Sequence, residues 1–204
     1  QGTNKIVLHT ASDSYFLGGN VGIGVIPQSN WTSTFDVLQM GEQTMLYAHA
    51  DGVGNDSATY LGTNVYDNSG AKYLRTDKSS MYRQQSGQHD FYVAPSGSAD
   101  AAITWTHAMR IDNSGNVGIG VTPKATQSSW VSLMLGHNQT ISAQCSLGVG
   151  NNFYIAQNAY RSTAPSWKHI SADEASAYAQ ADGNHNFYTA VCAAADATAA
   201  FTAK

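Results

Sequence analysis

The hexapeptide N-V-G-I-G-V occurs twice in the chain, at residues 20–25 and 116–121, and a proline follows each copy. The same shift of 96 residues aligns Y-R-Q-Q-S-G-Q-H-D-F-Y-V-A with Y-A-Q-A-D-G-N-H-N-F-Y-T-A, and A-D-A-A-I-T-W-T with A-D-A-T-A-A-F-T. Self-similarity at a fixed spacing is the signature of repeated structural modules. The sequence therefore predicts two copies of one module within 204 residues.

The ends of the two copies give the expected domain organisation. We expect module 1 to span residues 18–112 and module 2 to span residues 113–204. Residues 1–17 would be the end of a preceding repeat or an N-terminal connector, because T-A-S-D-S-Y-F-L-G-G leads into the first hexapeptide as A-M-R-I-D-N-S-G leads into the second. Module 2 stops in mid-repeat, so we expect the chain to be a segment of a longer protein.

Alternation of apolar residues predicts β-strands in both copies. In V-G-I-G-V the branched residues share one face of a strand and the glycines share the other. Glycine weakens a strand unless something approaches its backbone, so we interpret the glycine face as packed against a neighbouring chain or sheet. A-M-R-I-D-N-S-G-N-V-G-I-G predicts strand, turn and strand. Further strands are expected over residues 35–40, 58–66, 90–94 and 102–106 and in their counterparts.

One segment carries conflicting signals. In S-A-D-E-A-S-A-Y-A-Q-A, residues 171–181, Ser171 and Glu174 have the spacing of a capping box, and the alanines favour helix. Its partner in the first copy has weak helix character, so we predict strand or turn. The expected fold is all-β, with tandem modules of antiparallel, sandwich-like sheets.

Composition excludes several classes of partner. Only 12% of the residues are charged, the net charge is -4, and the 10 Lys and Arg residues are scattered singly. No basic stripe is present, so we expect no nucleic acid. No apolar run approaches the length of a membrane span and the N-terminus has no signal-peptide core, so we expect no membrane insertion. Cys145 and Cys192 stand outside any C-x-x-C motif, and we expect reduced thiols.

Cofactor motifs are missing from the sequence. Pro27 stands where the dinucleotide fingerprint needs glycine. D-G-V-G-N-D at 51–56 hints at a calcium loop, but the second copy reads L-G-V-G-N-N, which favours a turn. We expect no cofactor. The alternative is a metal at His89 or His185, which hold equivalent places and would form a ring of imidazoles in a three-fold assembly; packing beside Phe and Tyr is the other interpretation.

Trp31 is the candidate for ligand binding. An aromatic ring exposed among polar neighbours is a platform for sugar rings. Gln28 and Asn30 precede Trp31 and supply such neighbours, so these three residues form the candidate site. Packing of Trp31 in a surface or an interface is the alternative.

The pattern A-M-R-I-D-N-S-G-N-V-G-I-G-V-x-P, with the preceding G-Q-H-D-F-Y-V-A-P-S-G-S-A-D-A-A-I-T-W-T-H, resembles the recurrent segment of bacteriophage tail fibres and related receptor-binding fibres. The resemblance implies an elongated homotrimer, located on the virion and outside the cell when mature. Its other partners would be phage tail proteins and a bacterial surface glycan or protein. Many such fibres end in a self-cleaving chaperone domain, which would lie beyond Lys204. Their receptor sites vary too much to transfer any residue.

The expected function is therefore that of a non-catalytic tail fibre segment that displays or forms the host-binding part. The alternatives are a purely structural shaft, with recognition elsewhere, and a non-viral modular adhesin. A tailspike-like depolymerase would need two carboxylates in a groove. The sequence singles out no pair among the available ones, so we expect no enzyme; they are Asp36, Glu42, Asp90, Asp173 and Glu174.

Overall fold

The computed structural model describes residues 6–7, 15–16, 19–49, 57–145, 152–164 and 166–204. These residues form strands, turns and irregular segments with no helix among them, which confirms the all-β class. Over this part of the chain, nothing helical has the length and hydrophobicity that a membrane crossing requires.

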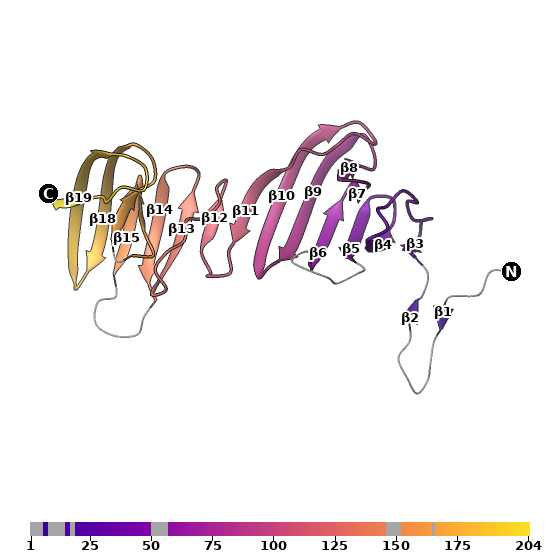
Figure 1. Ribbon diagram of the computed structural model, residues 1–204, viewed down its shortest axis with the longest axis horizontal. Coiled ribbons are helices and arrows are strands. Elements are labelled where there is room, and N and C mark those ends of the chain that lie inside the picture. Colours follow the sequence, from indigo (N-terminus) through magenta and orange to yellow (C-terminus); the bar gives the residue numbers. More distant parts are fainter. Residues whose placement is uncertain (1–5, 8–14, 17–18, 50–56, 146–151, 165) are drawn as a thin grey trace. The chain divides into compact units, whose positions relative to one another are not determined.

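The chain divides into two compact units (Figure 1). Unit 1 comprises Gln1–Ser86 with Tyr92–Thr106, and unit 2 comprises Gly87–Phe91 with His107–Lys204. The module bounds expected from the sequence, 18–112 and 113–204, stay a prediction.

Unit 1 is built on a sheet with the strand order β3-β4-β5-β6-β9. β3 pairs with β4 in parallel, and the other neighbours are antiparallel. The strands are β3 (Val21–Ile23), β4 (Phe35–Met40), β5 (Thr44–His49), β6 (Ala58–Thr63) and β9 (Asp77–Gln85). β10 (Gln88–Gly97) follows and divides between the units, while β1 (Ile6–Val7) and β2 (Tyr15–Phe16) form a separate antiparallel pair.

Unit 2 is also built on a sheet. Its sheet runs β11-β12-β13-β14-β15-β18-β19-β20, with β12 and β13 parallel and the other pairs antiparallel. Their bounds are β11 (Thr106–Ile111), β12 (Val117–Ile119), β13 (Trp130–Leu135), β14 (Gln139–Gln144), β15 (Phe153–Gln157), β18 (Asp173–Ala181), β19 (Asn184–Ala193) and β20 (Thr202–Ala203). β11 and β12 form the strand, turn and strand that the sequence predicted.

A small hairpin packs on each sheet, and a buried asparagine starts it. β7 (Val65–Asp67) pairs with β8 (Ala71–Tyr73), and β16 (Ala159–Arg161) pairs with β17 (Trp167–His169). Asn64 and Asn158, which precede β7 and β16, are fully buried and have φ of 57° and 54°. Asparagine adopts this left-handed conformation more readily than most residues. The strand expected over residues 58–66 is therefore two strands, β6 and β7, separated at Asn64.

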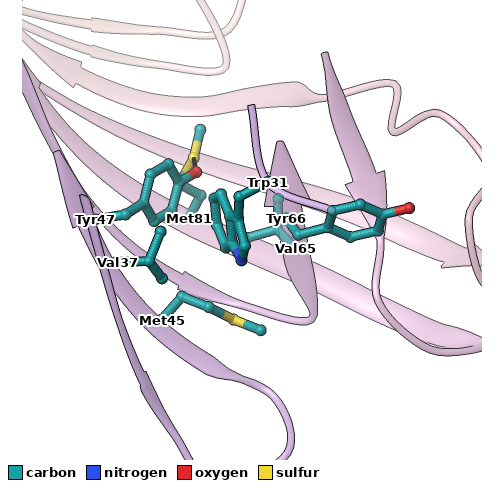
Figure 2. Close-up of a cluster of buried hydrophobic side chains, with 7 residues drawn as sticks. All are labelled: Trp31, Val37, Met45, Tyr47, Val65, Tyr66 and Met81. Atoms are coloured by element: carbon teal, nitrogen blue, oxygen red, sulfur yellow. Dashed lines mark hydrogen bonds between the residues drawn. The ribbon is translucent and has the colours of Figure 1, made fainter. Parts of the chain in front are cut away.

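The core of unit 1 lies between its sheet and the β7–β8 hairpin (Figure 2). It contains Trp31, Val37, Met45, Tyr47, Val65, Tyr66 and Met81. Figure 2 shows Trp31 among side chains of β4, β5 and β7. We call the sheet face that carries this core the inner face, and the opposite one the outer face.

Alanines form much of the core of unit 2. Ala175, Ala177 and Ala179 of β18 are all buried and alternate with half-buried Ser176 and Tyr178. Their spacing of two residues places every alanine on the inner face of a strand. The prediction of strand over residues 171–181 is confirmed from residue 173 on, because burial of one face outweighs the helix propensity of alanine.

The interpretation of the glycine face in N-V-G-I-G-V is wrong for the first glycine of each copy. A Cβ at Gly22 would collide with the carbonyl oxygen of Val25 and would lie 2.8 Å from Cδ of Pro27. Gly118 meets Val121 and Pro123 in the same way. The chain folds back onto its own glycine, so the close neighbour is a tight local turn rather than another chain or sheet.

Two other expectations have clear outcomes. Residues 102–105 are irregular apart from an isolated bridge between Lys72 and Ala102, so the strand expected over 102–106 is wrong. There, Ile103 and Trp105 pack against the core of unit 1 instead of joining the sheet. Cys145 and Cys192 are exposed free cysteines, as expected. The calcium-loop motif at 51–56 lies outside the described residues.

Candidate functional site

The outer face of unit 2 has a row of apolar side chains across its middle, which we call the central row. It consists of directly paired residues, one from each strand: Leu133, Ile141, Ile155, Tyr178 and Phe187. Directly paired residues place their side chains on one side of the sheet, about 5 Å apart. Ile155 is 48% exposed and Phe187 is 61% exposed. Five neighbouring strands, shown side by side in Figure 1, therefore present a continuous apolar stripe to solvent.

Two flanking rows lie on either side of the central row. Leu135 lies in one row and Val131 in the other. The first row is Leu135, Gln139, Gln157, Ser176 and Thr189, and the second is Val131, Ala143, Phe153, Gln180 and His185. Together the three rows contain no Asp, Glu, Lys or Arg.

Unit 1 presents the same arrangement. Its central row is Leu38, Leu46, Leu61 and Tyr82, again joined by direct pairing. Leu46 is 41% exposed and Leu61 is 48% exposed. The flanking rows are Met40, Thr44, Thr63 and Ser80, and Asp36, Ala48, Thr59 and Gln84, so that Asp36 is the one charged residue among these positions.

A shallow hollow of about 560 Å³ lies on the outer face of unit 2. Ile141, Ile155, Tyr178 and Phe187 of the central row line it, and Gln139 and Gln157 border it. The Tyr178 hydroxyl is hydrogen-bonded to Nδ1 of His185 and accepts a hydrogen bond of 3.1 Å from Nε2 of Gln180. Apolar bodies therefore form the middle of the hollow, and neutral polar groups lie along its sides.

An exposed apolar stripe of this kind needs a physical explanation. The solvent face of an antiparallel sheet is normally polar, and large apolar patches on soluble proteins mark interaction sites. The sequence reasoning did not identify these rows. The available signal was that F-D-V-L-Q-M and W-V-S-L-M-L place apolar residues on both faces of the strand, whereas a strand with one solvated face alternates apolar with polar residues.

The exposed aromatic platform expected at Trp31 is wrong, because the side chain is in the core. Trp31 is only 9% exposed, and its ring centroid lies 4.9 Å from that of Tyr47. The polar neighbours that suggested exposure lie in the loop before β4, while the ring turns inward against Phe35 and Tyr66.

Gln28 and Asn30 make hydrogen bonds in and beside the loop that precedes Trp31, and ligand binding at these two residues stays a prediction. The backbone N–H of Gln28 donates a 2.8 Å hydrogen bond to Oε1 of Gln39, a buried residue of β4. Asn30 is exposed and accepts a long hydrogen bond of 3.5 Å from the Ser29 hydroxyl. The hydrogen bond to Gln39 joins the start of the loop to β4, and the Trp31 ring belongs to the core.

His89 and His185 are both exposed. His185 stacks on Tyr178, with ring centroids 5.9 Å apart, which is packing beside aromatic residues as the second interpretation expected. Over the described residues, no group of three or more His, Cys, Asp or Glu side chains is placed to hold a metal ion. A metal shared between copies of the chain stays a hypothesis of the sequence.

Buried tyrosines hold aspartates at matching places in the two units. The Tyr66 hydroxyl donates a 2.7 Å hydrogen bond to Asp100, and the Tyr160 hydroxyl donates a 2.8 Å hydrogen bond to Asp196. Burial, and then the hydrogen bond to the carboxylate, raises the pKa of each tyrosine to about 12. The hydrogen bond from Tyr160, with Lys124 at 3.1 Å, lowers the pKa of Asp196. These pairs fasten the segments after β10 and β19 onto the hairpins.

The carboxylate of Asp90, one of those considered for catalysis, is held by contacts within the fold. It is fully buried in unit 2, where Arg110 Nε donates a 2.6 Å hydrogen bond to its carboxylate and His107 Nε2 lies at 2.8 Å. A buried carboxylate is stable as an anion only with such partners. Asp173 and Glu174 are exposed neighbours at the start of β18, where Asp173 accepts a hydrogen bond from the Glu174 backbone.

Comparison with known proteins adds no relative. No protein-family model, no curated protein and no solved structure matches the chain.

Proposed function

We propose that this chain is a non-catalytic segment of a homotrimeric bacteriophage tail fibre, displayed on the virion and holding or forming the part that meets the host cell surface. The partners in this proposal are two further copies of the chain, other phage tail proteins, and a bacterial surface glycan or protein. The proposal includes the finer architecture of tandem β modules joined end to end along a fibre.

The observation that carries the proposal is that contacts which build the fold of unit 1 recur in unit 2. In both units a glycine, Gly22 or Gly118, lies against the turn that follows it in the chain. A buried asparagine in the left-handed conformation also recurs, at Asn64 and Asn158. The Tyr66–Asp100 hydrogen bond likewise recurs as Tyr160–Asp196, also 94 to 96 residues later. A protein that gains length by adding units repeats the contacts that build each unit. What recurs here is scaffold, which suits a fibre.

Whether this chain is a receptor-binding segment or a plain shaft depends on which part of the fibre binds the host receptor. Burial of the Trp31 ring removes the aromatic platform for sugars, and this supports the shaft alternative. Binding by surface loops remains the function we propose for the fibre as a whole. Both roles require the same elongated assembly.

Negative-stain electron microscopy of the purified chain, and of the same chain with one module deleted, tests the proposal. We expect straight rods that become shorter by a constant length when a module is removed. Compact particles of unchanged dimensions would contradict a fibre. Binding of the intact assembly to bacterial envelope fractions then separates the two roles: capture supports a receptor-binding segment, and absence of capture from all fractions supports a shaft.

A further inference from the structure

The outer faces have the composition of a surface that meets an identical surface. A symmetric assembly brings a residue near the symmetry axis together with its own copies. A charged side chain there would face the same charge at short range, which is unfavourable where water is excluded. The three rows of unit 2 avoid this with Leu, Ile, Val, aromatic and neutral polar side chains, and unit 1 differs only by Asp36.

The chemistry of the central rows also points to protein. Leu133, Ile141 and Ile155 are branched aliphatic side chains, which pack best against other aliphatic groups. The rings of Tyr178 and Phe187 complete this row, and aromatic side chains of this kind are enriched in protein interfaces. The absence of Lys and Arg from these rows removes the attraction that anionic lipid or nucleic acid would need. A partner with the same uncharged apolar stripe is the best match.

The size of the outer faces fits a stable interface. With strands about 4.8 Å apart and residues about 3.4 Å apart, the three rows cover roughly 500 Å² in unit 2 and roughly 400 Å² in unit 1. A stable protein interface takes about 800 Å² from each partner. Neither outer face reaches this area alone, but the two outer faces of one chain together come to roughly 900 Å², which is the size of a standard stable interface.

We propose that each of the two outer faces, centred on the Leu38–Tyr82 row in unit 1 and on the Leu133–Phe187 row in unit 2, is a surface through which copies of this chain associate, which rests on the fibre function proposed above. The occupant of each outer face is the outer face of another copy. Each central row then becomes part of a shared core, and Leu61 and Ile155 each lie beside their own copies.

Lysine substitutions in the central rows test this assignment. Leu61→Lys and Ile155→Lys, singly and together, are compared with Ile26→Lys, whose side chain is 90% exposed in the turn after β3 and lies outside the rows. Multi-angle light scattering gives the molar mass, and circular dichroism reports whether each variant is folded. We expect the double variant to show a threefold lower molar mass with its β-sheet signal retained, and Ile26→Lys to keep the mass of the parent protein.

A cross-linking measurement keeps the test decisive if the lysine variants fail to fold. Leu61→Cys or Ile155→Cys is introduced after the exposed Cys145 and Cys192 have been replaced by serine. We expect a short three-armed maleimide to link three chains through either cysteine, and to link none through Ile26→Cys.

The results separate the two proposals. If the parent protein is a single chain in solution, both the fibre function and the assigned surface are overturned. If the parent is a trimer that the lysine variants preserve and the cysteines do not cross-link, the fibre function stands and the assigned surface is wrong. Retention of the trimer with loss of binding to envelope fractions would instead make the outer face a receptor site.

Discussion

The ring of Tyr73 fills the space that a side chain at Gly97 would need. A Cβ at Gly97 would collide with carbons of the Tyr73 ring, and the hydroxyl of Tyr73 donates a 2.7 Å hydrogen bond to the carbonyl of Pro95. In unit 2 the corresponding residues, 96 positions later, are His169 and Ala193. The larger ring is accompanied by glycine and the smaller ring by alanine, so the two positions are matched in volume.

The correspondence of Tyr73 with His169 rests on their backbones. The N–H of Tyr73 donates to the carbonyl of Ala101, and the N–H of His169 donates to that of Ala197, both at 3.0 Å. We expect Gly97→Ala to lower the free energy of unfolding by about 1–3 kcal/mol, because overpacking forces the ring or the strand to move. In a Tyr73→His background the same change should cost much less. Urea denaturation of the four proteins in this cycle measures the coupling, and equal costs in both backgrounds would contradict the contact.

Substitution of the first glycine in each hexapeptide should be more harmful than substitution of the second. Gly22→Ala places a methyl group against the Val25 carbonyl, whereas Gly24 has φ of 72° but no atom within 4 Å of an added Cβ. We expect Gly24→Ala to cost about 1 kcal/mol, from its backbone conformation alone. Gly22→Ala should cost more, because the turn must open. Thermal unfolding of both variants, in the parent protein and in the Leu61→Lys, Ile155→Lys background that should be a single chain, makes the comparison. A cost for Gly22→Ala that appears only in the assembled protein would restore an interchain explanation.

Substitution of Asn158 should destabilise the fold more than most single substitutions do. It is fully buried, its side-chain N–H groups lie within 3.2 Å of the carbonyls of Ser171, Asp173 and Glu174, and its φ is 54°. Asn158→Ala leaves these groups unsatisfied and strains the backbone, so we expect a loss of about 3 kcal/mol or more. Asn158→Gly removes the strain and should recover about 1 kcal/mol. Chemical denaturation of both variants checks the order, and alanine equal to or better than glycine would contradict it.

Alkaline pH should weaken the hydrogen bonds that join the β7–β8 and β16–β17 hairpins to Asp100 and Asp196. The pKa values of Tyr66 and Tyr160 are raised from 10.0 to about 12 by burial and by their hydrogen bonds to aspartate. The folded protein therefore holds these two protons more tightly than the unfolded chain. The resulting stabilisation is complete below pH 10 and is lost as the pH rises from 10 to 12.

Ultraviolet titration of tyrosinate measures this directly. We expect two tyrosines to ionise near pH 12, and Asp196→Asn to lower the pKa of Tyr160 while leaving that of Tyr66 unchanged. Asp100→Asn is the matched control and should do the reverse. Asparagine suits both sites because Asp100 and Asp196 have positive φ. A titration in which neither variant moves a tyrosine would contradict the assigned pairs.

The sequence predicted strands well where residues alternate along the strand in a way that marks its buried face. The strand expected over residues 35–40 is β4, Phe35–Met40, and the alternate alanines of β18 are visible as a period of two. The irregular segment 102–105 escaped prediction, since an apolar residue that packs on a sheet looks the same in sequence as one inside it. Asn64 likewise divides a predicted strand through a backbone angle that the sequence does not display.

The candidate surface was less accessible to sequence reasoning. Polar neighbours made Trp31 look exposed, but the direction of its ring is set by the loop, which the sequence does not define. The central rows depend on register, because Leu46 lies beside Leu38 and Leu61 only when three strands pair as they do here. The glycines of the hexapeptide showed correctly that something comes close, without showing that it is the same chain.

The molar mass of the folded protein in solution, measured by light scattering on a size-exclusion column, tests the central claim most directly. The account predicts a single species of three times the 21.7 kDa chain, stable on dilution. A monodisperse species of one chain mass would contradict it, because the apolar central rows of both units would then lie exposed with no partner.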